Sequence, residues 1–356
     1  PIIYYSIWDD LPYPMWNAPF YGSCDLIMGI SKQSDNIHRE VLEQNGFGVY
    51  DYDAGSNEEN PNLEWNEVVT GFVPHGLNHN TYKPISSADE LYKKYYSDIK
   101  EKNNIKFLVF WNNRNIRRKQ PGDVLLAYKY FMDGLTPEQQ KECVLVFHTQ
   151  PCDDNGTDLP RVHQHLCPEY DVCFTYEKGG AFNDESMNLL FNSADVYINL
   201  ASNEGFGLGS AEAITVGTPI IVNVTGGLQD QCGFTDDDGN LLTPEDYVEL
   251  GSNHRGRYKN HGEWVKPVWP TSISLQGSPP TPYIWDDRCQ PEDASKRLRE
   301  FYDMGRKERK RLGSIGTKFF RENQMTAVAM ADNFISSMNT AFENWKPKKK
   351  YDMVSI

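Results

Sequence analysis

Three absences narrow what this chain can be. None of its seven cysteines forms a Cys-x-x-Cys pair, and this odd, scattered set predicts reduced thiols rather than a disulfide framework. No apolar run approaches the roughly 20 residues that a membrane-spanning helix needs. Basic residues are outnumbered, with 35 Lys and Arg against 50 Asp and Glu and a net charge of −15. That balance argues against general nucleic-acid binding.

An initiating methionine and a recognisable signal peptide are also missing. The chain starts with Pro1, and residues 2–7 already read as a strand from the middle of a sheet. We therefore expect a fragment or processed product whose N-terminal domain is truncated. For its location we expect the cytoplasm, with peripheral attachment to a membrane as the alternative.

The 356 residues are enough for two domains of ordinary size. Hydrophobic residues make up 39% and charged residues 24%, which predicts a folded protein rather than a disordered one. Aromatic residues reach 13%. That content suits a carbohydrate-handling protein, but an aromatic-rich core explains it equally well.

Strands alternate with helices along most of the chain. Strands are predicted at 2–7, 24–30, 106–110, 143–147, 171–175, 194–200 and 219–224, and residues 72–78 are predicted as a short strand that runs into a loop. Helices are predicted at 36–44, 87–100, 121–131, 162–167, 187–193, 294–304, 307–320 and 328–342. This order predicts an α/β fold with parallel, doubly wound sheets.

The predicted elements divide the chain into three parts. Residues 1–84 form a partial N-terminal Rossmann-like domain, and residues 85–325 form a C-terminal Rossmann-like domain with a polar insertion at about 233–285. Residues 326–356 form a helix, which we expect to pack back on the first domain, and a basic tail. No structure or role could be assigned to the insertion or to the acidic segment 51–67.

The glycine-rich segment 200–222 lies between two predicted strands of the second domain. Its glycines allow backbone N–H groups to approach a ligand, and the helix that follows offers its N-terminus to phosphate or sugar oxygens. Glu204 falls in the turn, and Glu212 follows eight residues later. At 3.6 residues per turn this spacing predicts that both carboxylates share one side of the helix.

The loop 111–119 also follows a strand, and it carries four cations in an acidic protein. They are Arg114, Arg117, Arg118 and Lys119. Because parallel strands end at the same sheet edge, this loop should meet the glycine-rich segment there. Guanidinium and ammonium groups at that edge would neutralise a diphosphate, although a solvated loop is the alternative.

Other polar residues remain open between a functional and an ordinary structural role. Asp9 and Asp10 end a first-domain strand where a carboxylate could meet a sugar, and an acidic turn is equally consistent. His75 precedes Gly76 in a loop that we expect to face the cleft between the two domains. The remaining histidines and cysteines fit no common zinc spacing, so no metal is expected.

Together these segments resemble the retaining GT-B glycosyltransferases of family 4. The resemblance rests on Ser-Asn-Glu-Gly-Phe-Gly-Leu-Gly-Ser-Ala-Glu-Ala at 202–213, Gly-Thr-Pro-Ile-Ile at 217–221 and the glycine pair 226–227. It is extensive over about 70–230 and loose over 1–45. This sequence departs from the family pattern in three ways. In the cationic loop, Asn113 and Gln120 stand where glycine is usual. The first domain lacks the early strands and the glycine-rich loop that faces the acceptor, and Asp9 stands where a histidine is usual.

The resemblance implies a role for each matching residue. Arg114 and Lys119 would hold the donor diphosphate, and Glu212 would bind the ribose. The donor sugar would be held by Glu204 and the backbone of Gly205, Phe206 and Gly207, with Leu208 beside them; Thr175 and Tyr176 would border the base. Asp9, Asp10 and His75 form the first-domain side of the site.

The activity implied is hexose transfer from a UDP- or GDP-linked sugar to an unknown acceptor, with retention of anomeric configuration and without a metal or other cofactor. The acceptor could be a glycan, lipid, protein or small molecule. Two alternatives remain: a GT-B sugar-nucleotide epimerase and a non-catalytic module that binds a nucleotide sugar or carbohydrate.

Overall fold

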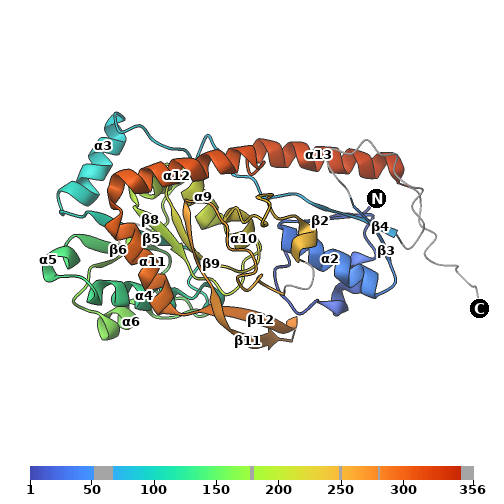
Figure 1. Ribbon diagram of the computed structural model, residues 1–356, viewed down its shortest axis with the longest axis horizontal. Coiled ribbons are helices and arrows are strands. Elements are labelled where there is room, and N and C mark those ends of the chain that lie inside the picture. Colours follow the sequence, from blue (N-terminus) through green and yellow to red (C-terminus); the bar gives the residue numbers. More distant parts are fainter. Residues whose placement is uncertain (52–66, 177–179, 248–250, 280, 346–356) are drawn as a thin grey trace, which may run out of the picture.

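The computed structural model describes residues 1–51, 67–176, 180–247, 251–279 and 281–345. Within these ranges the chain forms two parallel sheets that lie one beyond the other along the long axis (Figure 1). The first has the order β1(Ile3–Ser6), β2(Leu26–Gly29), β4(Glu67–Phe72), β3(Gly48–Asp51). The second has the order β10(Val265–Val268), β9(Ile220–Asn223), β8(Val196–Asn199), β5(Phe107–Asn112), β6(Cys143–His148), β7(Val172–Phe174). The predicted α/β fold with two doubly wound sheets is confirmed.

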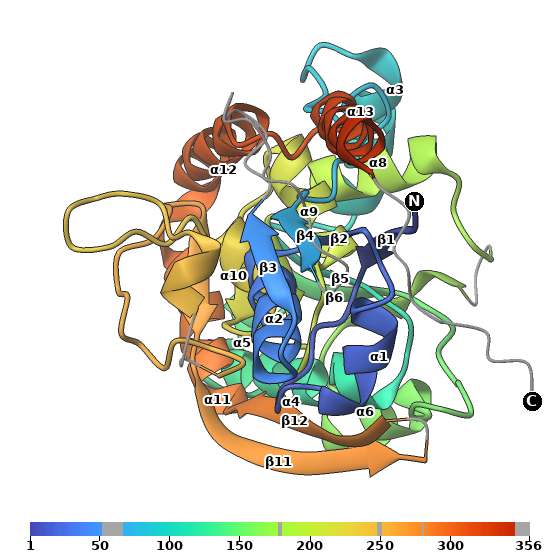
Figure 2. The ribbon, with the colours of Figure 1, turned by 90° about the vertical axis from the view of Figure 1, so that its right-hand side faces the viewer.

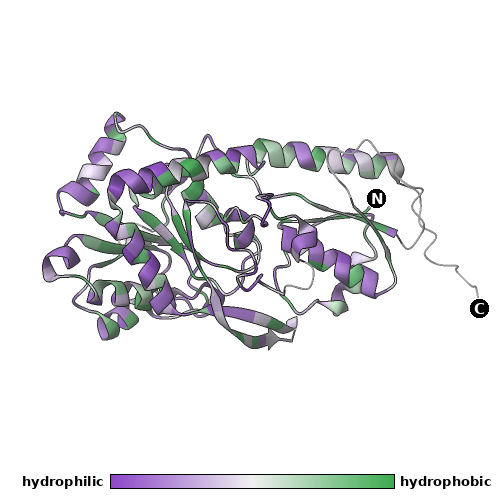
Figure 3. Cartoon of the chain, viewed as in Figure 1, coloured by the Kyte–Doolittle hydropathy of each residue, from purple (hydrophilic) through white to green (hydrophobic). Residues whose placement is uncertain are grey.

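Apolar residues cover both faces of the second sheet. Along β5, Leu108 and Phe110 pack on one side, while Phe107, Val109 and Trp111 pack on the other. The first side is covered by α8(Asp184–Ser193), α9(Leu208–Val216) and α12(Gly305–Glu322), and the second by α4(Pro121–Asp133), α6(Leu159–Leu166) and α11(Pro291–Asp303). Figure 3 shows hydrophobic strands inside a shell of more hydrophilic helices.

The first sheet is sandwiched between α2(Lys32–Gln44) and α13(Ala327–Asn344). Side chains of α2 pack with Ile27 and Val68, whereas Met330 and Phe334 of α13 pack against the opposite face. Figures 1 and 2 show α13 running alongside this sheet although it follows α12 of the other half. The helix α2 begins earlier than predicted, because the Ser31 side chain caps it.

The chain crosses between the two halves twice, and the crossings touch. Leu77 N–H donates to the carbonyl of Met325 at 3.1 Å, and Ala327 N–H donates to the carbonyl of Leu77 at 2.9 Å. A Cβ on Gly76 would lie 2.2 Å from the Thr326 carbonyl oxygen, so only glycine allows this approach. The predicted domain boundaries, near residues 84 and 325, remain predictions.

Residues 233–285, which the sequence left unassigned, include part of the second sheet. Strand β10 adds to its edge beside β9, where Pro267 is tolerated. The strands β11(Pro270–Ser278) and β12(Thr281–Cys289) form an antiparallel hairpin. The basic tail at 346–350 and nearly all of the acidic segment 51–67 lie outside the described residues.

Shorter elements complete the described chain. They are η1(Met15–Asn17), α1(Ala18–Tyr21), α3(Glu90–Tyr96), η2(Ser97–Glu101), η3(Arg117–Lys119), α5(Pro137–Gln140), α10(Leu228–Gln231) and η4(Pro244–Tyr247). Among the helices described, none combines the length and the apolar character needed to cross a bilayer. None of the seven cysteines, all of which lie in the described residues, forms a disulfide.

Candidate functional site

The loops that follow β5 and β8 meet at the carboxyl edge of the second sheet. Glu204, only 4% exposed, accepts hydrogen bonds from Lys119 Nζ, from Arg118 Nη1 at 3.4 Å and from Asn199 Nδ2 at 3.3 Å. Arg118 also donates to the carbonyl of Asn203 at 2.8 Å. The predicted meeting of the cationic loop with the glycine-rich segment is therefore observed in the structure.

Burial and charge oppose each other in this cluster. Burial by itself would raise the pKa of Glu204, but Lys119 and Arg118 hold it below its usual value. Burial also lowers the pKa of Lys119, although Glu204 opposes that effect. Two cations therefore face the buried carboxylate of Glu204 at the carboxyl end of the sheet, and Asp9 and Asp10 also lie near Arg118.

Glycines allow three backbone segments to pack around Glu204. The N–H of Gly227 donates to the carbonyl of Glu204 at 2.7 Å, and a Cβ on Gly226 would lie 2.3 Å from that oxygen. Gly207 caps α9 with a φ of 91°, a conformation that favours glycine. Gly226 and Gly227 therefore form part of the wall of this site.

Glu212 occupies a different environment from Glu204. Helix α9 begins at Leu208, so Glu204 lies in the turn before the helix, as predicted, and Glu212 lies within it. That both carboxylates share one side stays a prediction. Burial raises the pKa of Glu212 to about 7, with Asp184 adding to this effect and hydrogen bonds from Tyr82 and Asn112 opposing it. Leu208, at the start of the helix, is 51% exposed.

The structure does not bring Arg114 to the Glu204 cluster. Its Nε atom donates to Asp153 Oδ2 at 3.1 Å, and 64% of its side chain is exposed. The next residue, Asn115, is fully buried and donates to the carbonyls of Pro151 at 3.0 Å and Thr157 at 2.7 Å. These bonds fix the loop so that Arg118, rather than Arg114, lies beside Glu204.

Thr175 and Tyr176 follow β7 and surround a histidine that the sequence did not single out. His148 Nδ1 lies 2.7 Å from the Thr175 hydroxyl, and its ring lies 5.5 Å from that of Tyr176. Burial lowers the pKa of His148, which favours the neutral imidazole. Its position at the end of β6 was the available signal, but a histidine after a strand is common in ordinary loops.

The first sheet presents Asp9, Asp10 and His75 to this edge. Asp9 is close enough to Arg118 and Glu204 for both to perturb its pKa, although burial has the larger effect and raises it. Burial, and then Asp9, raise the pKa of Asp10 to about 8. The His75 ring makes an edge contact with Phe206 at 5.4 Å. The site is therefore built from both halves.

A cavity of about 600 Å³ adjoins the two aspartates on the first sheet. Its wall includes Tyr4, Trp8 and Phe20. Across the junction, Gly205 lies against this segment, because a Cβ there would be 3.1 Å from the carbonyl oxygen of Ile7. Aromatic rings and carboxyl groups thus stand together next to the charged cluster.

The hairpin β11–β12 supplies acidic residues that sequence reasoning missed. Asp286 accepts a hydrogen bond from Arg117, and Asp287 accepts one from the Thr225 hydroxyl at 2.7 Å. These contacts hold the cationic loop and the turn after β9 in place. Among the described residues, no group of three His, Cys, Asp or Glu side chains could hold a metal ion; the absence of a cofactor stays a prediction.

Comparisons with known proteins agree with this geometry. The family model described as glycosyl transferases group 1 matches residues 178–251, which include the glycine-rich segment, Glu204 and Glu212. No curated protein matches the chain significantly. The resemblance inferred from the sequence is confirmed over the matched segment.

Solved structures resemble nearly the whole chain. Sucrose-phosphate synthase from Thermosynechococcus elongatus matches with a TM-score of 0.57 and 16% identity, over 92% of this chain and 61% of that one. The UDP-forming α,α-trehalose-phosphate synthase from Burkholderia vietnamiensis gives 0.58 and 12%, over 96% and 66%. Anabaena HepE in complex with UDP and glucose gives 0.59 and 13%, over 96% and 72%.

The fold is GT-B. At these identities the likeness concerns the fold alone, and the chain spans less than two thirds of the first two structures. In this GT-B fold the second sheet carries the family match, and Glu204 lies at its carboxyl edge.

Proposed function

We propose that the protein is a glycosyltransferase that moves a hexose from a UDP- or GDP-linked sugar to an acceptor hydroxyl, with retention of configuration. The observation that carries this proposal is the buried contact of Glu204 with Lys119 and Arg118, at the carboxyl edge of a GT-B second sheet. Charge of this kind, held in place before the ligand arrives, stabilises a leaving diphosphate. Among the GT-B proteins of similar structure, one is a UDP-forming synthase and another is in complex with UDP and glucose, which supports a UDP donor.

The donor roles follow the family pattern. Lys119 neutralises the diphosphate, and Arg118 joins it because the structure puts it beside Glu204. Arg114 turns from Asp153 to the diphosphate when the donor binds, since an exposed ion pair of this kind is worth only about 0–1 kcal/mol. Glu204 and the backbone of residues 205–207 bind the sugar, Glu212 binds the ribose, and Thr175 and Tyr176 border the base.

In the transfer step the bond between the anomeric carbon and the diphosphate oxygen breaks. A bond to the acceptor oxygen forms on the same face, and the acceptor proton passes to the departing phosphate. The cations do the electrostatic work, so no metal is required. Asp9, Asp10 and His75 orient the acceptor hydroxyl from the first sheet.

A panel of UDP- and GDP-sugars tests the proposal. We expect one of them to raise the melting temperature of the protein and to be hydrolysed or transferred, with the anomeric configuration retained by NMR. Arg114→Ala should weaken nucleotide binding by about tenfold, whereas Lys94→Ala, the same kind of change on an exposed helix, should not. An inverted product would contradict the family 4 mechanism. Binding without turnover of any donor would favour the non-catalytic alternative.

A further inference from the structure

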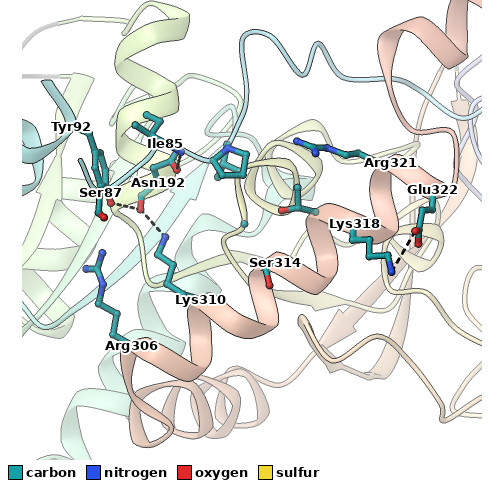
Figure 4. Close-up of a pocket in the computed structure, with 14 residues that line it drawn as sticks. Ile85, Ser87, Tyr92, Asn192, Arg306, Lys310, Ser314, Lys318, Arg321 and Glu322 are labelled. Atoms are coloured by element: carbon teal, nitrogen blue, oxygen red, sulfur yellow. Dashed lines mark hydrogen bonds and ion pairs between the residues drawn. The ribbon is translucent and has the colours of Figure 1, made fainter. Parts of the chain in front are cut away.

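A groove lined by several cations lies along α12, away from the Glu204 cluster. It has a volume of about 700 Å³ and runs between α12, the segment 84–87 and the C-terminal end of α9 (Figure 4). Its lining includes the cations Arg306, Lys310, Lys318 and Arg321, all from α12. Their spacing of four, eight and three residues keeps them on neighbouring positions of one helix face.

Most of this positive charge has no carboxylate partner. Arg306 donates to the Tyr96 hydroxyl and lies over its ring, at 4.3 Å from the centroid. Lys310 donates to the Asn192 carbonyl at 3.0 Å. The acid in the lining, Glu322, lies 3.6 Å from Lys318. In the part of the chain that the structure describes, Arg306, Lys310 and Arg321 form no ion pair.

The buried residues near the groove also carry more positive than negative charge. Lys100 and Arg309 are 1% and 4% exposed, and both bind the same carboxylate, that of Asp195. Two buried cations thus share one anion directly below Lys310. Burial, and then the proximity of Arg306, lower the pKa of Lys310 to about 8, although Asp195 opposes this. An anion in the groove would relieve this repulsion.

The rest of the lining suits a small polar molecule rather than a bare ion. Ser87, Ser314 and Thr317 supply hydroxyl groups, while Pro84 and Ile85 supply an apolar wall. The volume lies within the range of about 300–1,000 Å³ that is usual for small-molecule sites. Three unpaired cations beside hydroxyl groups match a phosphate ester of a polyhydroxy compound.

We propose that this groove binds a phosphate ester, independently of the site at Glu204. Arg306 and Lys310 bind the phosphate at one end of the groove, and the organic part of the ester extends towards Arg321 at the other end (Figure 4). The ester bridges α12 and the segment 84–87, which is held against α8 by hydrogen bonds from Lys83 N–H to Asn188 and from Ile85 N–H to Asn192. The proposed site therefore lies within the half that contains the second sheet.

Titration calorimetry with glycerol 3-phosphate tests the site on the full chain. We expect saturable binding that is weakened at least tenfold in the double variant Arg306→Gln, Lys310→Gln. The single variant Arg321→Gln changes an exposed side chain without an ion pair among the described residues, so it should fold normally and weaken binding about threefold or more. Lys307→Gln, an exposed neighbour on α12 outside the groove, is the matched control and should bind like the unaltered chain.

One further variant and two further ligands test whether binding depends on this groove and on the phosphate. Lys119→Gln should keep full affinity, because it alters the other site. Glycerol should not bind, because it lacks the phosphate. Vesicles of phosphatidylglycerol that bind through Arg306, Lys310 and Arg321 would identify a lipid headgroup as the source of the phosphate. The proposal is overturned if glycerol 3-phosphate does not bind saturably up to 10 mM, about where affinity becomes negligible, or if Arg321→Gln and Lys307→Gln bind equally well.

Discussion

The two sheets differ in how completely their strands are buried. Four central strands of the second sheet, β5, β6, β8 and β9, are almost wholly buried between two helix layers. In the first sheet the strand β1 has only one of its four residues buried, and Ile2, Tyr4 and Ile7 are more than 40% exposed. A helix from the far end of the chain, α13, covers one face of that sheet.

The difference in burial indicates that the second half holds its site residues in a fixed position. The second sheet carries Glu204 and Lys119 on loops held by buried hydrogen bonds and close glycine contacts, so their geometry is set before a ligand arrives. The first sheet contributes Asp9 and His75 across the junction from a less covered scaffold. Substitutions at Phe110, Lys119, Phe334 and Glu212 test this difference between the two halves, and their expected effects decrease in that order.

Phe110→Ala should be the most destabilising of the four changes. Phe110 is fully buried in the second sheet, where it packs on Phe191 at 4.9 Å. Removing the ring leaves a cavity, so we expect the free energy of unfolding to fall by about 3–5 kcal/mol. Chemical denaturation followed by circular dichroism measures this, with Phe20→Ala, at a site that is 70% exposed, as the control. A loss below about 1 kcal/mol would contradict the contrast.

Lys119→Met should mainly affect the proposed reaction. The change removes one of two cations beside the buried Glu204 carboxylate. We expect kcat/KM for the donor identified above to fall about 100-fold, which corresponds to about 2.7 kcal/mol. Lys129→Met removes a partly exposed cation paired with Asp133 on α4, outside the site, and should change kcat/KM by less than twofold. Equal effects of the two variants would remove Lys119 from the site.

Phe334→Ala should destabilise the first sheet less than Phe110→Ala destabilises the second. Phe334 is only partly buried, and its ring meets Tyr5 edge-on at 4.8 Å. We expect a loss of about 2 kcal/mol, below the range for a fully buried ring. Hydrogen exchange of β1 and β2 should increase while that of β5 and β8 does not. Ile335→Ala, 58% exposed on the same helix, is the control.

Glu212 should make stability depend on pH. Its pKa is raised from 4.5 to about 7, so the folded chain holds this proton more tightly than the unfolded chain does. The resulting stabilisation is complete below about pH 4 and is lost as the pH rises through about 7. After allowance for partial exposure, we expect an effect on the order of 1 kcal/mol. Urea denaturation at pH 5 and 8 should show this loss, and Glu212→Gln should reduce it.

Much of the fold was predictable because its signals are local. The runs at β5, β8 and β9 are continuous and apolar, as buried parallel strands must be, and their order with the helices indicated doubly wound sheets. Strand β10 carries Lys266 and Pro267 in only four residues, so its pairing with β9, rather than its composition, makes it a strand. No local pattern could have identified it.

The candidate site was predictable in its location but not in its detail. The meeting of Lys119 with Glu204 followed from the shared sheet edge. The choice of Arg118 over Arg114 did not, because it depends on the buried hydrogen bonds of Asn115 to a loop 35 residues away or more. The pattern did place Glu204 in the turn and Glu212 in the helix that follows, and α9 begins between them at Leu208.

The paired crossings at Leu77 and Thr326 limit how the molecule can move. Since the two segments are hydrogen-bonded to each other, they behave as one hinge rather than as two separate tethers. If the two halves move apart, they must rotate about this point. Helix α13 moves together with the first sheet, because it packs against that sheet. A side chain at Gly76 would collide with the Thr326 carbonyl group at this hinge.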